Sequence, residues 1–328
     1  MSRVLGRIAT AILSLSIVAE MGLAQVNIST TFIFESFIYT RPGTQGVKNR
    51  ASWIYGEAQL NRSTKLVGSY LDFPIAGYTV KDQNGADQYV PGSTLHILDE
   101  AFLETRFDDK VVRMGRIRSR FGFDDWSELF YTPIAQAPMV RTNPINNLAL
   151  LRFDTGFDIQ GGRPDFEYQV GMVDTSNDGW QIAPKRLDHA SARVQFSRGD
   201  LIVGLNGLSK IQGGGNRDTM AAIDLRWTRP NLIVRAEVDK GFDQGSNGEG
   251  GYIDVFYRPQ GMFRTQFGIR EEAYNSPSGM RSSLTTVGFR HILSPEMALN
   301  VNYGWGNDVG PALAMRGWTV QLMTAVRF

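Results

Sequence analysis

Apolar and polar residues alternate with a period of two along most of the chain. Between residues 151 and 160, the odd positions are Leu, Phe, Thr, Phe and Ile, and the even positions are Arg, Asp, Gly, Asp and Gln. The same alternation runs through residues 231–240 and 317–328. Successive side chains of a β-strand point to opposite faces, so the pattern predicts strands with one apolar and one polar face. No stretch outside residues 119–147 keeps a helical period.

Sixteen segments with this pattern are predicted to be strands. They are about 27–40, 49–61, 65–73, 94–107, 110–118, 148–160, 165–174, 187–197, 200–209, 219–228, 231–240, 251–258, 262–272, 282–292, 296–305 and 315–328. Strand ends inferred in this way are good to a few residues.

The connections between these segments alternate between short and long. The short ones are residues 62–64, 108–109, 161–164, 198–199, 229–230, 259–261 and 293–295, and the long ones are 41–48, 74–93, 119–147, 175–186, 210–218, 241–250, 273–281 and 306–314. This sorting places the tight turns at one end and the loops at the other. It predicts an all-β fold, a transmembrane antiparallel β-barrel of about 16 strands with both termini on the periplasmic side. A soluble β-sandwich, the alternative, has no reason to sort its connections.

The charged residues decide which face of the barrel meets lipid. Arg235, Glu237 and Asp239 share one face of their segment, and an arginine facing lipid at mid-membrane costs about 2–4 kcal/mol. The polar face is therefore predicted to line the lumen and the apolar face to meet lipid. Aromatic residues near strand ends fit interfacial girdles. These are Tyr39, Trp53, Phe107, Trp227, Tyr257, Tyr303, Trp305 and Trp318.

The N-terminus reads as a secretory signal. Arg3 and Arg7 precede an apolar run over residues 8–19, and small residues follow at 22–24. This arrangement predicts a cleaved signal peptide, residues 1–24, and a mature barrel, residues 25–328, exported to the bacterial outer membrane. An N-terminal core helix is the alternative. No later segment has the roughly 18 apolar residues of a membrane helix.

The last predicted strand ends in Phe328. A terminal aromatic residue on such a strand resembles the assembly signature of bacterial outer-membrane proteins. This resemblance implies recognition by the barrel assembly machinery, and the location implies outer-membrane lipids and lipopolysaccharide as partners.

The longest connection, residues 119–147, is rich in aromatic residues. It contains Phe121, Phe123, Trp126, Phe130 and Tyr131, which are too apolar for a loop in water. A long loop without its own secondary structure is usually functional. We expect this loop to fold into the lumen, bury its aromatic side chains on the inner wall and narrow the pore. A short helix capped by the acids at 124 and 125 is predicted within it.

The stretch that leads into this loop resembles a known protein family. The run 112–122, Val-Arg-Met-Gly-Arg-Ile-Arg-Ser-Arg-Phe-Gly, is similar to a stretch of the phosphate-selective porin O and P family. Arg120 stands where that family commonly has proline. The resemblance implies a homotrimeric diffusion channel. It does not imply phosphate, because the chain lacks the dense Lys and Arg of an anion-specialised pore.

The charges expected on the whole lumen face are nearly balanced, with eleven arginines and thirteen acids. The residues predicted to form the constriction are Arg116, Arg118, Arg120, Asp124, Asp125, Glu128 and Arg141. The residues predicted to line the pore are Arg113, Arg152, Arg193, Arg226, Arg235, Arg258, Arg264, Arg270, Arg290, Glu100, Glu104, Asp154 and Asp158. Two arrangements are open: loop acids facing wall arginines across a transverse field, or wall charges paired with their neighbours. Arg116 and Arg118 fit poorly, because they share a strand face with Val112 and Met114.

Enzymatic and nucleic-acid-binding functions find little support. The net charge of +1 provides no attraction for nucleic acid, and the absence of cysteine excludes thiolate chemistry. No catalytic residue, cofactor or metal site is predicted, since the three histidines are far apart and no nucleotide-binding motif is present. His189 and Ser191 are spaced as in outer-membrane phospholipases, but their face is predicted to be the lumen. The prediction is a porin that passes ions and small hydrophilic solutes. A barrel with a structural, adhesive or lipid-hydrolysing role and a soluble binding protein are the alternatives.

Overall fold

A computed structural model describes the fold of the chain. It describes residues 25–27, 31–39, 46–49, 52–74, 78–81, 87–90, 94–118, 121–122, 132–134, 138–142, 153–174, 187–211, 217–242, 247–295, 297–307 and 316–327. The predicted signal peptide, Phe328 and much of the loop 119–147 lie outside these residues.

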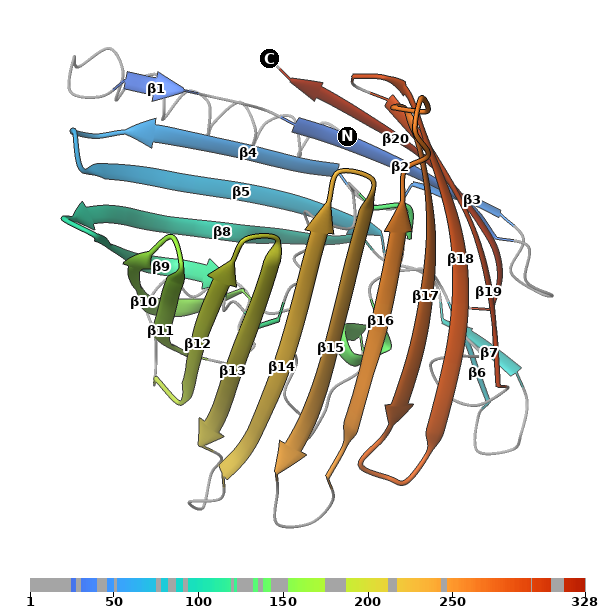
Figure 1. Cartoon of the computed structure of the whole chain (residues 1–328). Coiled ribbons are helices and arrows are strands. Elements are labelled where there is room, and N and C mark those ends of the chain that lie inside the picture. The colour runs from blue at the N-terminus through green and yellow to red at the C-terminus, as the bar shows by residue number, and fades with distance from the viewer. Residues whose placement is uncertain are drawn as a thin grey trace.

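One antiparallel sheet closes on itself to form a barrel (Figure 1). Its strands are β1 (Gln25–Asn27), β2 (Thr31–Tyr39), β3 (Gly46–Asn49), β4 (Ser52–Gln59), β5 (Thr64–Pro74), β8 (Thr94–Phe107), β9 (Lys110–Arg118), β10 (Phe153–Arg163), β11 (Phe166–Asp174), β12 (His189–Arg198), β13 (Leu201–Ile211), β14 (Arg217–Arg229), β15 (Leu232–Phe242), β16 (Glu249–Tyr257), β17 (Thr265–Asn275), β18 (Arg281–Ser294), β19 (Met297–Gly306) and β20 (Gly317–Arg327). From β4 to β20 each strand of this sheet pairs with the next one, β1 pairs with β4, β2 pairs with β3, and β20 pairs back onto β2.

The wall contains sixteen strands, as the sequence predicts. The sheet has 18 segments, but β1 with β2 and β3 with β4 are each two halves of one strand. β1 pairs with β4 and β2 pairs with β3, and the two registers differ by one residue, because Asn27 lies opposite Glu57 whereas Ser36 lies opposite Asn49. The all-β barrel and its strand number are therefore confirmed.

Two elements interrupt the long connections. A hairpin of β6 (Tyr78–Lys81) and β7 (Asp87–Val90), which the alternation did not predict, lies between β5 and β8. A single helical turn, α3 (Met139–Thr142), lies in the loop between β9 and β10 and contacts β16 and β17. Within the described part of the chain, no helix is long and apolar enough to cross a membrane.

The barrel is polar inside and apolar outside. In β15, Arg235, Glu237 and Asp239 are at most 1% exposed, whereas Val238 on the opposite face is 64% exposed. A soluble protein shows the reverse distribution. The alternation read from the sequence therefore assigned the polar face to the lumen correctly.

The short turns and both described chain ends lie at one end of the barrel. Gln25 pairs with Gln59, next to the turn that joins β4 to β5, and Arg327 pairs with Thr31. At the opposite end, Tyr303 lies between Trp305 and Trp318 on the outer surface, with ring centroids 5.9 and 4.7 Å away. Phe107 and Tyr257 are exposed at the short-turn end. These aromatic residues occupy both rims, as predicted for girdles.

Two glycines allow neighbouring strands to approach closely beside the loop. Gly115 in β9 pairs with Gly156 in β10. A Cβ atom at Gly156 would lie 2.0 Å from the carbonyl oxygen of Met172 in β11, and Gly115 has a φ of +132°. Only glycine fits such backbone contacts without movement of the wall.

Candidate functional site

The described segments of the third loop, which is the connection at residues 119–147, lie inside the barrel and are hydrogen-bonded to the inner wall. The Gly122 N–H donates to Asn206 Oδ1 in β13 at 3.1 Å. Asn302 in β19 donates from Nδ2 to the Pro133 carbonyl at 2.6 Å. The Met139 N–H donates to Glu272 Oε2 in β17 at 2.6 Å. The wall residues belong to different strands, so the loop is fixed across a wide part of the lumen.

Glycines on the inner wall make room for the loop. A Cβ atom at Gly250 would lie 2.5 Å from Val140 Cγ1, and one at Gly268 would lie 2.7 Å from Pro133 Cγ. At Gly288, a Cβ atom would lie 2.4 Å from the Pro133 carbonyl oxygen. Glycine inside a strand often marks such a close approach. This signal is present in the sequence, but the alternation of polar and apolar residues alone does not reveal it.

Apolar contacts hold the loop in addition to the hydrogen bonds. Phe121, Met139 and Val140 are at most 6% exposed and belong to one buried cluster with residues of the wall. The wall residues are Leu208, Met220, Ala222, Tyr252, Tyr274 and Leu284. They lie on the lumen face, where the sequence predicted polar residues. The expected burial of Phe121 is confirmed, whereas Phe123, Trp126, Phe130 and Tyr131 lie outside the described residues.

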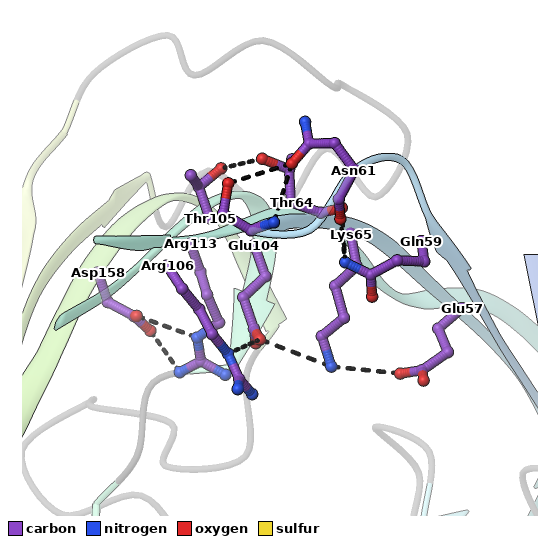
Figure 2. A network of polar contacts seen from close by, with 11 residues as sticks. Glu57, Gln59, Asn61, Thr64, Lys65, Glu104, Thr105, Arg106, Arg113 and Asp158 are labelled. Carbon is purple, nitrogen blue, oxygen red and sulfur yellow. Dashed lines mark hydrogen bonds and ion pairs between the residues drawn. The ribbon is translucent and has the colours of Figure 1, made fainter. Parts of the chain in front are cut away.

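On the first strands of the barrel, basic side chains of the wall are bound to acidic side chains of the wall. Arg113 in β9 donates from Nε and Nη2 to the two carboxylate oxygens of Asp158 in β10, at 3.0 and 2.6 Å. Beside this pair, Lys65 lies 3.2 Å from Glu57 and 3.5 Å from Glu104. Figure 2 shows these side chains reaching toward one another, and they come from β4, β5, β8, β9 and β10, which are neighbours in the sheet. The charges therefore form a lateral network along the wall.

The arginines of the second half are paired in the same way. Arg193 in β12 forms a two-point ion pair with Asp224 in β14, and Asn206 between them bonds to both. Asp224 is completely buried, and Arg193 is 8% exposed. Both groups are thus neutralised locally.

One carboxylate, Asp254 in β16, binds two arginines. Arg235 Nη2 lies 2.6 Å from Oδ2, and Arg270 Nε lies 2.6 Å from Oδ1. The guanidinium groups also lie over aromatic rings, Arg235 over Phe256 at 4.8 Å and Arg270 over Tyr252 at 5.2 Å. This triad carries one net positive charge. Of the two arrangements left open by the sequence, lateral pairing describes Arg113, Arg193, Arg235 and Arg270.

The other residues predicted to line the pore or to form its constriction fall into three groups. Glu100, Glu104, Arg226 and Arg290 lie on the inner face of their strands. Arg258 directly follows β16 and continues its ladder, because its N–H donates to the Asn231 carbonyl. Arg152, Arg120, Asp124, Asp125 and Glu128 lie outside the described residues, and only the backbone of Arg118, Arg141 and Asp154 is described.

Two predicted residues lie elsewhere. Arg116 shares the outer face of β9 with Met114, since Arg113 and Ile117 point inward and are buried. Arg264 lies in the turn before β17 and is exposed, because the Met262 N–H donates to the Pro259 carbonyl and the Thr265 N–H donates to the Met262 carbonyl before the strand begins. Arg116 therefore does not belong to the inner wall, and Arg264 lies at its edge, where its carbonyl accepts from the Ile292 N–H. His189 and Ser191 lie on the lumen face of β12, not toward lipid.

A closed barrel of sixteen antiparallel strands with its third loop bound inside defines the porin type of outer-membrane fold. No protein-family model and no curated protein sequence matches the chain. Solved structures match over nearly its whole length. OmpF of Salmonella typhi, in complex with daunomycin, has a TM-score of 0.65 at 12% identity and covers 93% of this chain and 98% of its own.

Two further structures support the same conclusion. The anion-selective porin from Comamonas acidovorans has a TM-score of 0.62 at 12% identity and covers 93% of this chain and 100% of its own. OmpT of Vibrio cholerae, in its trimer form, has a TM-score of 0.59 at 11% identity, with 92% and 99% covered. At such low identity the likeness shows the porin fold. The narrower resemblance to the phosphate-selective family is not confirmed.

Proposed function

We propose that the chain is an outer-membrane porin, a water-filled channel for passive diffusion of ions and small hydrophilic solutes. The observation that carries this proposal is the third loop, which is hydrogen-bonded to Asn206, Glu272 and Asn302 inside a closed, charged barrel. Such a loop narrows a polar passage without a moving part. Its fixed contacts favour a permanently open constriction over a gate.

The outer surface fits lipid. Met114, Ile223 and Val238 are each more than half exposed on the apolar face, and the aromatic residues at the two rims match the interfacial girdles of membrane barrels. Contact with outer-membrane lipids and lipopolysaccharide belongs to this proposal. So does a homotrimer, the form in which OmpT of Vibrio cholerae was solved.

Export and assembly complete the proposal. Cleavage after residue 24 would release a barrel that begins at Gln25, where β1 starts. Both ends of the barrel would then face the periplasm with the short turns, as in outer-membrane barrels. Phe328 would complete the last strand and present the signal for the barrel assembly machinery.

Conductance in a planar lipid bilayer tests the channel. The protein, purified in detergent and shown to migrate differently before and after heating, should insert as stepwise increases in current, because its lumen is lined by charged groups that favour water. The same sample after boiling is the control. A folded sample that inserts without conductance would contradict the proposal and favour a structural role.

The charges of the loop are proposed to set the ion preference at the constriction, together with Arg120 and Arg141. The wall arginines with described partners are bound to carboxylates and keep a net charge of +1 only in the Asp254 triad, so we expect the loop acids Asp124, Asp125 and Glu128 to have the stronger influence on passing ions. Changing them to Asn, Asn and Gln should shift the reversal potential in a salt gradient toward anions. Asp200→Asn, at an exposed turn, is the control. An unchanged reversal potential would show that the loop acids do not set selectivity.

A further inference from the structure

Three neighbouring hairpins at the short-turn end of the barrel repeat one arrangement of residues. β10, β12 and β14 each end in an arginine, a two-residue turn follows, and the next strand begins with an apolar residue directly opposite that arginine. The opposed pairs are Arg163 with Phe166, Arg198 with Leu201, and Arg229 with Leu232. Figure 1 shows the three hairpins next to one another at the same end of the barrel. We call the three arginines the arginine row.

The arginine row lies on the outer surface of the barrel. In β12, Arg193 points into the lumen and is 8% exposed, so Phe196 and Arg198 share the outer face. Phe196 is 49% exposed, and Phe166 lies directly opposite it, with the two ring centroids 5.2 Å apart. Arg163 pairs with Phe166 and is therefore on the outer face as well.

Arg229 lies on the same face, beside an aromatic ring. Its guanidinium carbon is 5.4 Å from the ring centre of Trp227, two residues earlier in β14. Trp227 lies directly opposite Leu201, which is 37% exposed on the outer surface. Amphipathic aromatic side chains are enriched where the apolar core of a membrane meets the lipid headgroups. The arginine row therefore lies at the headgroup level, at the edge of the apolar band.

Backbone hydrogen bonds between the hairpins hold the arginine row at one level. The carbonyl of Asp165, in the first turn, accepts from the Ser197 N–H at 2.9 Å. The carbonyl of Asp200, in the second turn, accepts from the Thr228 N–H at 2.9 Å. Each bond joins a turn to the residue that directly precedes the arginine of the next hairpin. The three guanidinium groups are thus carried by a fixed backbone along one rim of the barrel.

The guanidinium groups of the row are available to an anion. Arg198 is exposed, and among the residues that the structure describes its side chain has no ion-pair or hydrogen-bond partner. Arg163 lies 3.8 Å from Asp165, and both side chains are more than 70% exposed. Arg229 lies 3.0 Å from Asp200, and these side chains are 57% and 48% exposed. Exposed pairs of this kind contribute little to stability, so a phosphate can compete with either carboxylate.

We propose that the arginine row binds the phosphate groups of anionic phospholipids in the membrane leaflet at the short-turn end. The guanidinium groups of Arg198 and Arg229 donate to the phosphate oxygens, for which their planar forks are well suited. The apolar residues opposite them, Leu201 and Leu232, contact the acyl chains. A zwitterionic lipid binds less well, because its ammonium group meets the same cations. The proposal rests on the proposed membrane location of the porin.

Quenching of tryptophan fluorescence by brominated lipids tests the proposal. The folded protein is reconstituted into phosphatidylcholine vesicles that contain a minor fraction of brominated phosphatidylglycerol or, in a parallel sample, of brominated phosphatidylcholine. The emission of Trp227 is the difference between the natural protein and Trp227→Phe. An arginine near the membrane surface favours an anionic lipid roughly fivefold, so brominated phosphatidylglycerol should quench Trp227 about twofold more strongly. Both leaflets have the same composition, so the orientation of the barrel does not affect the result.

Arg198→Gln combined with Arg229→Gln should abolish the preference for phosphatidylglycerol. Arg281→Gln is the matched control, because Arg281 is also exposed on the outer face but lies at the loop end of β18, so its loss should leave the quenching of Trp227 unchanged. If the double variant does not fold, Arg198→Gln alone should lose about half of the preference, because Arg198 contributes one of the two guanidinium groups.

Three results would overturn the lipid site. They are equal quenching of Trp227 by the two brominated lipids, quenching by neither lipid, and an equal loss of preference in Arg281→Gln and the double variant. Conductance in a planar bilayer is measured on the same preparation and reports on the channel separately. Normal conductance with equal quenching would overturn the lipid site alone, and preferential quenching without conductance would contradict the channel alone.

Discussion

Replacing Asp254 by Asn should destabilise the barrel strongly and shift its selectivity toward anions. Asp254 is completely buried and binds Arg235 and Arg270 at once. Asparagine preserves the shape but removes the charge, so the triad changes from one net positive charge to two. Breaking a buried ion pair by removal of one partner costs about 3–5 kcal/mol, which urea-induced unfolding of the protein in detergent micelles would measure.

The exposed pair Asp200–Arg229 provides the control for this prediction. Its oxygen and nitrogen lie 3.0 Å apart, but the side chains are 48% and 57% exposed. An exposed pair contributes less than about 1 kcal/mol, so Asp200→Asn should change neither the free energy of unfolding nor the reversal potential appreciably. If the two substitutions changed the free energy of unfolding equally, burial of the triad would not explain its contribution to stability.

The sequence predicted the barrel well because the physical pattern of a membrane strand is local. The segments 94–107 and 110–118 match β8 and β9 at both ends. The tight turn between these strands contains Asp108, which has a positive φ of 52°. A turn of two residues shows in the sequence where one strand ends and the next begins. The segment predicted at 148–160 is β10, Phe153–Arg163. Its ends depend on how far the neighbouring strands extend, and that information lies elsewhere in the chain.

The inner surface was harder to predict than the strands. Alternation identifies the face of a residue, but it does not show what covers that face. Leu208, Met220 and Leu284 interrupt the polar lumen face because the loop packs on them. Their unusual position was visible in the sequence, and together with Gly268 and Gly288 it marks the wall that receives the loop.

Ion pairs could not be predicted because they depend on register. Arg113 and Asp158 are 45 residues apart and become neighbours only because Arg113 lies directly opposite Asp158 in the β9–β10 ladder. A shift by two residues would have separated them on the same face. Arg116 shows the opposite case. The alternation had placed it with Met114 on the outer face, and its inclusion at the constriction was wrong.

An engineered disulfide should fix the third loop to the wall in nearly all molecules. A Cβ atom at Gly250 would lie 2.5 Å from Val140 Cγ1, so cysteines at the two positions have their Cβ atoms close to the distance that a disulfide requires. The natural chain contains no cysteine, and no other thiol competes. We expect Val140→Cys with Gly250→Cys to form the bond spontaneously in an oxidising compartment, with nearly complete protection from a mass-tagged maleimide after unfolding.

A control pair of cysteines and a measurement of single-channel conductance distinguish a fixed loop from a mobile one. Val140→Cys with Gly207→Cys places the second thiol on the outer face of β13, where no other atom lies within 4 Å of a Cβ, so both thiols should remain reactive. Because the loop already contacts the wall at Val140, reducing the bond between positions 140 and 250 should leave the single-channel conductance unchanged. Free thiols at 140 and 250, or a conductance that rises severalfold on reduction, would show that the loop leaves the wall in solution and that the constriction opens.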